Sequence, residues 1–283
     1  MKPAPFEYRA PGTVAEVVEL LHEQGDSAKI LAGGQSLVPM LNMRLARPDM
    51  IVDISHVPQL RDVQITADGC RYGAAVVHSA IEDQRVPDLT RGLLPAAAAG
   101  IGYRAIRNRG TFGGSLSHAA SSAEWPIVMA ALDATIICQS IRGSRNVPAR
   151  EFVLGFLTNA LEDDELVTEV DVPALASGVS WGLHKTARKP GEFADSFAVT
   201  LVEETEGVVT NVVAWLGAAS DVPLNVDTLD GLLRSRPLQE ARKSEVLAAV
   251  AASLPEPHTK DEEYRTHLHG VTMWRALHVG EAT

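Results

Sequence analysis

Near its start the chain changes from a helical to an extended pattern of apolar positions. Thr13 and Glu16 have the spacing of a capping box, which predicts a helix that begins there and ends near Gly25. The short run over residues 29–32 then predicts a strand. The apolar face of the predicted helix consists of Val14, Val17, Val18 and Leu21.

Between residues 50 and 139 the pattern predicts a mixture of strands and helices. Alternating apolar positions on both sides of Asp68-Gly69 indicate a β-hairpin. Glu124 is the last residue of a Ser-x-x-Glu sequence, which predicts that another helix begins at Ser121. We expect strands over 50–54, 63–66, 70–77 and 134–139, and helices over 81–85, 92–99 and 121–132.

From about residue 151 the pattern favours strands first and helices afterwards. Pro173 closes one predicted strand, and Glu206-Gly207 is placed as the turn of a hairpin. We expect an antiparallel meander of four strands, over 166–172, 181–185, 196–203 and 208–217. Helices are expected over 226–234, 238–254 and 261–277, the last with Tyr264, Leu268, Val271 and Trp274 on one face.

Two segments combine adjacent glycines with small hydroxyl side chains, and they point to a ligand. They are residues 31–38, with Gly33-Gly34, and residues 109–116, with Gly113-Gly114. Glycine pairs permit positive φ and a close approach of the backbone to a ligand, and successive N–H groups there can converge on an anion. Two such segments predict a dinucleotide held by its pyrophosphate. Neither segment has the G-x-G-x-x-G spacing of a Rossmann fold or that of a P-loop.

Composition narrows the class of protein. The formal net charge of −11 argues against nucleic acid as a partner, because phosphate binding needs a basic surface. Two cysteines are too few for a [2Fe–2S] cluster, and the nine histidines lack metal-site spacing, so we expect no metal in this chain. No signal peptide or membrane-spanning run is recognisable, which favours a cytoplasmic protein without a transmembrane segment.

The glycine segments and later motifs together resemble one family. Residues 31–45 resemble the first FAD loop, and residues 106–119 the second, of the FAD-binding medium subunits of molybdenum hydroxylases. This family includes the medium subunit of aerobic carbon monoxide dehydrogenase and the flavin domain of xanthine dehydrogenase. Further matches follow in the expected order: Asp164-Glu165-Leu166-Val167, Lys185-x-x-Arg188 and Glu263-Tyr264-Arg265-x-x-Leu268.

The resemblance implies an α+β fold. Its first part would be a vanillyl-alcohol-oxidase/PCMH-like FAD-binding domain over residues 1–175, in two subdomains, 1–55 and 56–175. Its second part would be a C-terminal domain over 176–283, with a three-stranded antiparallel sheet and helices.

The resemblance also implies an oxidoreductase that works in a complex. FAD would be the cofactor of this chain, a small partner subunit would carry two [2Fe–2S] clusters, and a large one would carry the molybdenum cofactor. Electrons would pass from the clusters through FAD to an external acceptor, in a dimer of heterotrimers. This chain would then need no catalytic acid or base of its own.

Carried over by position, the resemblance implies a set of FAD-binding residues. Residues 31–38 would surround the pyrophosphate and the ribityl chain, Ile101 would lie near the flavin ring, and Thr111, Gly114 and Ser115 would bind from the second loop. The complete set is Leu31, Ala32, Gly33, Gly34, Gln35, Ser36, Leu37, Val38, Ile101, Thr111, Gly113, Gly114, Ser115, Glu124, Leu166, Val167 and Lys185.

Three positions in this set carry particular expectations. Lys185 would lie near the isoalloxazine, where its charge would stabilise the reduced flavin. Glu124 would lie near the adenosine portion, or it would only cap its helix. Ala120 stands where relatives often have aspartate, so any hydrogen bond of that carboxylate is lost unless Ser121 or Ser122 replaces it.

Two other functions are compatible with the residues alone. One is a self-contained flavin oxidase or dehydrogenase of the same superfamily, which would need its own catalytic base. The other is a binding module that keeps the fold without flavin. A yellow colour would exclude the flavin-free module, and co-purification with cluster and molybdenum subunits would separate the two flavin-containing alternatives.

Overall fold

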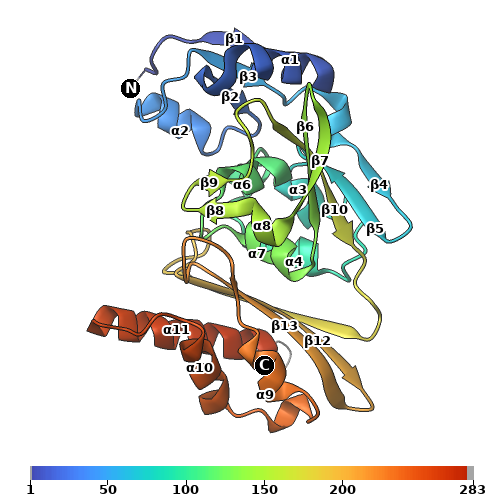
Figure 1. The fold of residues 1–283 in the computed structure, drawn as a ribbon, viewed down its shortest axis with the longest axis vertical. Helices are drawn as coiled ribbons and strands as arrows, with labels where there is room; N and C mark the ends of the chain where they lie inside the picture. The colour runs from blue at the N-terminus through green and yellow to red at the C-terminus, as the bar shows by residue number, and fades with distance from the viewer. Residues whose placement is uncertain (1, 279–283) are drawn as a thin grey trace.

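The N-terminal part of the protein is a small parallel sheet with a helix packed on it. The computed structural model describes residues 2–278 and shows this part at the top of the view in Figure 1. Its strands, in the order β1-β3-β2, are β1 (Glu7–Arg9), β3 (Met50–Asp53) and β2 (Ala28–Leu31). Helix α1 (Val14–Gln24) buries Val17, Val18 and Leu21 against them, as the sequence predicts. Helix α2 (Leu37–Asn42) follows the first glycine pair.

The middle part is a five-stranded antiparallel sheet in the order β4-β5-β10-β6-β7. Short helices lie beside it, around a core that includes Tyr72, Phe112 and Trp125 in edge-on contact. The strands are β4 (Val63–Ile65), β5 (Gly69–Gly73), β6 (Thr135–Ser140), β7 (Gly143–Pro148) and β10 (Leu166–Pro173). The helices are α3 (His78–Glu82), α4 (Leu93–Gly100), α5 (Arg104–Arg107), α6 (Phe112–His118), α7 (Glu124–Ala131) and α8 (Ala149–Phe152), and a small hairpin joins β8 (Val153–Gly155) to β9 (Thr158–Asn159).

The C-terminal part is an antiparallel sheet that has protein packed on both faces. Phe197, Val199 and Leu201 join the core of the middle part, whereas the alternate residues Ala198 and Val202 face the C-terminal helices. The strands, in sheet order, are β11 (Val179–Thr186), β12 (Ser196–Thr205), β13 (Val208–Gly217) and β14 (Leu224–Asn225). The helices are α9 (Thr228–Leu233), α10 (Lys243–Ala252) and α11 (Lys260–Leu277), which lie at the bottom of Figure 1.

Several expectations about the elements need correction. The strand that ends at Pro173 is β10, and it lies inside the middle sheet instead of in the C-terminal meander, whose fourth strand is the short β14. The helix expected over 81–85 begins at His78. The segment expected as one helix over 238–254 contains a 3₁₀ turn and then α10.

The orientation of the last helix also differs from the prediction. Tyr264 is 62% exposed, so it does not belong to a buried face. Hydrogen bonds join α11 to β11 and β12 through His269, Thr272 and the Ala276 carbonyl. The other residues of the expected face, Leu268, Val271 and Trp274, are only partly buried. The buried residues of α11 are His269, Gly270, Thr272, Met273, Ala276 and Leu277. None of the described helices is long and apolar enough to cross a bilayer.

Candidate functional site

A cavity of about 630 Å³ lies among the three parts of the protein. Its volume is within the range of about 300–1,000 Å³ that is usual for sites of small molecules and cofactors. It gathers residues from both glycine segments, from β10 and from β11. Of the predicted set, the residues that line it are Ala32, Gly33, Gly34, Gln35, Ser36, Leu37, Ile101, Thr111, Gly113, Gly114, Ser115, Glu124, Leu166, Val167 and Lys185.

The first glycine segment is an open loop between β2 and α2. Gly34 has a φ of +73°, a conformation that favours glycine. Leu31 and Val38, the two predicted residues that do not line the cavity, pack beneath Gly34, where a Cβ atom would lie 3.2 Å from Leu31 Cδ1 and 3.1 Å from Val38 Cγ2. Among residues 2–278, no group accepts a hydrogen bond from the N–H groups of residues 33–36. These free donors suit an anionic group.

The two glycine segments touch each other. A Cβ atom on Gly33 would lie 2.1 Å from the carbonyl oxygen of Arg109, which no real side chain permits. Only glycine at position 33 therefore lets the two segments form one continuous wall of the cavity.

The second glycine pair is not a turn, in contrast to the sequence prediction. Gly113 and Gly114 lie in the first turn of α6, and Thr111 caps this helix by accepting a hydrogen bond of 3.2 Å from the Gly114 N–H. The Gly113 N–H donates to the Ala74 carbonyl at 2.8 Å, and a Cβ atom on Gly113 would lie 2.4 Å from Ala74 Cβ. These N–H groups are already used within the protein. The glycines serve close packing here, and the hydroxyl groups of Thr111 and Ser115 provide the polar surface.

A buried ion pair lies at another part of the wall. Lys185 on β11 donates from Nζ to Glu124 Oε1 at 2.6 Å and to the Gly100 carbonyl at 3.0 Å. The side chains of Lys185 and Glu124 are only 15% and 7% exposed. Burial raises the pKa of Glu124, and the nearby ammonium group of Lys185 opposes this rise.

This pair bears on two expectations about Glu124. Glu124 contacts Lys185 directly, so both residues lie at the same part of the cavity wall, and the portion of FAD that each contacts stays a prediction. The capping interpretation is wrong, because α7 begins at Glu124 itself, after an N-cap at Ala123. The hydroxyl groups of Ser121 and Ser122 make no hydrogen bond to the described residues, so neither replaces a carboxylate at Ala120 there.

The wall of the cavity next to β10 also carries a buried charged side chain. Glu165, beside the predicted Leu166 and Val167, accepts hydrogen bonds of 2.7 and 2.6 Å from Arg145. Burial acts to raise the pKa of Glu165, but the bonds from Arg145 and from the backbone N–H of Glu162 outweigh it, so the pKa is lowered. Glu165 therefore stays ionised and paired at neutral pH.

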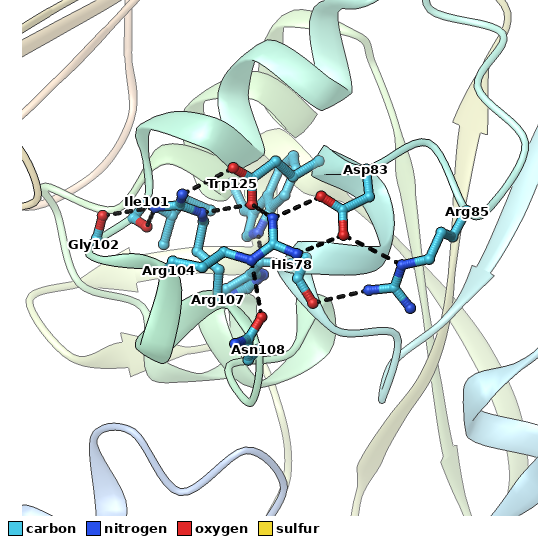
Figure 2. Close-up of polar contacts among 11 residues, drawn as sticks. His78, Asp83, Arg85, Ile101, Gly102, Arg104, Arg107, Asn108 and Trp125 are labelled. Atoms are coloured by element: carbon cyan, nitrogen blue, oxygen red, sulfur yellow. Dashed lines mark hydrogen bonds and ion pairs between the residues drawn. The ribbon is translucent and has the colours of Figure 1, made fainter.

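An arginine that the sequence does not single out holds the wall around Ile101. Arg107 donates to the carbonyl oxygens of Ile101 and Gly102 at 3.1 and 2.9 Å, and it forms a two-pronged pair with Glu82 at 2.7 and 2.8 Å (Figure 2). Arg104 joins the same cluster by binding Glu82. Guanidinium groups suit such sites because their donors have a fixed, planar geometry. The cluster therefore fixes α5 and the segment of Ile101 against α3.

Other residues that line the cavity carry no recognisable motif. His78 follows an apolar run, and residues 191–193 belong to the loop between β11 and β12. Phe193 is 67% exposed although it lines the cavity, so it lies at the mouth. A Pro-Gly turn at 190–191 is the only local signal near Phe193, and His78 has none.

Comparison with known proteins gives matches along the whole chain. Residues 4–175 match the family described as FAD binding domain in molybdopterin dehydrogenase. The carbon monoxide dehydrogenase medium chain of Hydrogenophaga pseudoflava is 32% identical, over 100% of this chain and 99% of that protein. The alpha subunit of the 6-hydroxypseudooxynicotine dehydrogenase complex of Paenarthrobacter nicotinovorans is 39% identical, over 71% of this chain and 68% of its own length.

Solved structures agree with these sequence matches. The crystal structure of quinoline 2-oxidoreductase from Pseudomonas putida 86 contains a chain with a TM-score of 0.90 and 31% identity to this protein. The match covers 98% of this chain and 97% of that one. The similarity therefore extends through the C-terminal sheet and helices, beyond the region of the family match.

Proposed function

This chain belongs to the family of FAD-binding medium subunits of molybdenum hydroxylases, and from this we propose that it carries electrons from the [2Fe–2S] clusters of a partner subunit, through its FAD, to an external acceptor. It is an oxidoreductase subunit, and its cofactor is FAD. The single observation that supports this role most strongly is the cavity that both glycine segments and the Lys185–Glu124 pair line together.

The residues of the cavity fit FAD. The free N–H groups of residues 33–36 suit the pyrophosphate, and the wall formed by Gly33 and Arg109 leaves no room for a side chain at position 33. Ile101 supplies an apolar surface and Lys185 a cation. When bound, FAD supplies a centre that accepts and releases electrons, while the protein sets its orientation and electrostatic surroundings.

The two glycine segments differ in what they offer to the cofactor. Residues 33–36 can donate from the backbone, whereas Thr111 and Ser115 offer hydroxyl groups because the N–H groups of their helix turn are already bonded. We propose that all residues of the predicted set that line the cavity contact FAD, and that Leu31 and Val38 act by supporting Gly34.

The cysteine content supports the need for a partner. Cys70 and Cys138 are the only cysteines, and both are buried as free thiols. A [2Fe–2S] cluster needs four ligands, so this chain does not supply a cysteine set for one. Relatives are medium chains or subunits of larger complexes, and this chain likewise acts in a heteromeric complex.

We propose the finer organisation on the basis of the family. A small subunit would carry the two [2Fe–2S] clusters, a large subunit would carry the molybdenum cofactor, and the complex would be a dimer of heterotrimers in the cytoplasm. Residues 1–55 and 56–175 would be the subdomains of the FAD domain, and residues 176–283 the C-terminal domain. The three larger sheets, one in each of these parts, support this division.

An anaerobic reduction experiment tests the proposed role. The flavin absorbance of the isolated chain is followed while N-heterocycles, aldehydes, purines or carbon monoxide are added. We expect no bleaching in the isolated chain and rapid bleaching in the assembled complex with its substrate. Bleaching of the isolated chain by one of these substrates would instead establish a self-contained flavin dehydrogenase.

A further inference from the structure

His78 occupies an unusual place in the wall of the cavity. It is the first residue of α3, it is 3% exposed, and it lines the cavity. Its backbone N–H donates to the Gly110 carbonyl at 2.9 Å. A Cβ atom on Gly110 would lie 2.9 Å from His78 Nε2, so the imidazole edge lies directly against the second glycine segment.

The neighbours of His78 determine which ring nitrogen carries the proton. The indole N–H of Trp125 donates to His78 Nδ1 at 3.0 Å, so Nδ1 is an acceptor and has no proton (Figure 2). Burial, and then the nearby charge of Arg107, lower the pKa of His78 to about 4. The ring is therefore neutral at physiological pH, and its single proton is on Nε2.

The Nε2–H group has no hydrogen-bond partner among residues 2–278. In the described part of the chain, the side-chain atoms that are both fully enclosed and without a partner are Glu204 Oε1 and Arg236 Nε. His78 Nε2 is not one of them, so protein atoms do not enclose it completely. Since His78 lines the cavity, Nε2–H faces open space there. Because His78 is only 3% exposed, this donor has little access to bulk water, and an oxygen atom of a bound ligand would give it a partner.

We propose that His78 is an FAD-binding residue, which donates a hydrogen bond from Nε2 to an oxygen atom of the cofactor beside the second glycine segment. This inference rests on the assignment of FAD to the cavity. Trp125 acts as a positioning residue, since its indole N–H fixes the tautomer that can donate.

His269 provides a matched control within the same chain. It is also a buried histidine, its Nδ1 is bonded to Ser196 Oγ at 2.8 Å, and burial lowers its pKa to about 4. It lies between α11 and β12 and does not line the cavity. A substitution there perturbs a similar buried ring without touching the cofactor site.

The test uses the full chain, freed of FAD and titrated with FAD while flavin fluorescence is followed. In His78→Asn, the amide oxygen stands near the position of Nδ1 and still accepts from Trp125, but the donor toward the cavity is removed. We expect the Kd for FAD to rise roughly three- to tenfold, the usual worth of one hydrogen bond. His269→Asn is expected to change the Kd less than twofold.

His78→Gln makes the opposite change. Its amide nitrogen reaches the position of Nε2 and can donate, but its side chain no longer accepts the hydrogen bond from the Trp125 indole. We expect it to restore FAD affinity at the expense of a lower Tm in the FAD-free chain. An unchanged Kd in His78→Asn, or an equal rise in His269→Asn, would overturn the inference. If the parent chain failed to bind FAD, the proposed function would fail as well.

A measurement on the unmodified sequence remains decisive if the variants do not fold. In protein labelled with ¹⁵N-histidine, the Nε2–H signal of His78 is expected to shift downfield when FAD is added, while that of His269 stays in place. A His78 signal that does not respond to FAD would refute the hydrogen bond.

Discussion

Replacement of Lys185 by methionine isolates the energetic role of the buried ion pair. The side chain of Glu124 is 7% exposed and keeps its carboxylate beside the Lys185 ammonium at 2.6 Å. Removing one partner of a buried pair typically costs about 3–5 kcal/mol, because the other charge stays buried without compensation. Lys185 also donates to the Gly100 carbonyl, which the variant leaves without that donor. We therefore expect Lys185→Met to destabilise the FAD-free chain by about 3 kcal/mol at pH 8.

The loss of stability in Lys185→Met depends on pH, and the pKa of Glu124 determines whether it grows or shrinks as the pH rises. Burial already places the folded-state pKa of Glu124 above its ordinary value of 4.5, and Lys185 limits that rise. Without Lys185 the pKa rises further, so above pH 4.5 the folded variant holds a proton that the unfolded chain releases. Stability of the variant then falls as the pH rises through this window, and the penalty is smaller at pH 5 than at pH 8.

Thermal unfolding of the parent, Lys185→Met and the double variant Glu124→Gln/Lys185→Met at both pH values measures the effect. At 2–4 °C per kcal/mol for a chain somewhat shorter than this one, about 3 kcal/mol lowers the Tm by roughly 6–12 °C. The double variant has no buried charge to leave unpaired, so it is expected to recover more than half of the loss. Equal losses at pH 5 and pH 8, together with additive effects in the double variant, would refute this reasoning.

Three further predictions concern the cofactor. Gly33→Ala places a Cβ atom 2.1 Å from the Arg109 carbonyl oxygen and is expected to weaken FAD binding at least tenfold, by about 1.4 kcal/mol or more, in a fluorescence titration. Gly231→Ala, whose Cβ meets open space, should bind like the parent. Acid precipitation is expected to leave all flavin in the supernatant as FAD, and flavin in the pellet would reveal a covalent link. In spectroelectrochemistry, Lys185→Met is expected to lower the FAD midpoint potential and Glu124→Gln to raise it. The shift is about 30 mV for each 1.4 kcal/mol of changed electrostatic stabilisation. Shifts of the same sign in both variants would contradict electrostatic control of the flavin by this ion pair.

The elements that the sequence predicts correctly are those that local patterns determine. Helix α1 carries both its cap and its apolar face within a dozen positions, and the hairpin of β4 and β5 contains its own turn. Strand β10 forms where predicted, but its sheet depends on pairing with β5 and β6, which no local pattern records. The glycines of α6 resemble a turn because glycine disfavours helices, whereas here the close contact of Gly113 with Ala74 and the Thr111 cap hold them in a helix.

The candidate site was predictable to a similar degree. Motif resemblance locates the glycine segments, because each is a continuous stretch of sequence. It locates Lys185 because this residue stands in the Lys185-x-x-Arg188 motif. The pairing of Lys185 with Glu124 and the orientation of His78 by Trp125 are tertiary contacts across 61 and 47 positions. Spacing alone gives no sign of such contacts.

The contact between Lys185 and the wall of the cavity bears on how the protein is made. Lys185 bonds to Gly100 and Glu124, which precede it by 85 and 61 positions, so the cavity closes only when β11 has joined the earlier part of the chain. Contacts of such long range are slow to form because the intervening loop must first be closed. During translation, residues 4–175 emerge before the strand that completes their site. The nascent chain can therefore hold FAD in its final environment only after β11 has emerged and joined the earlier residues, so flavin binding reports this docking step.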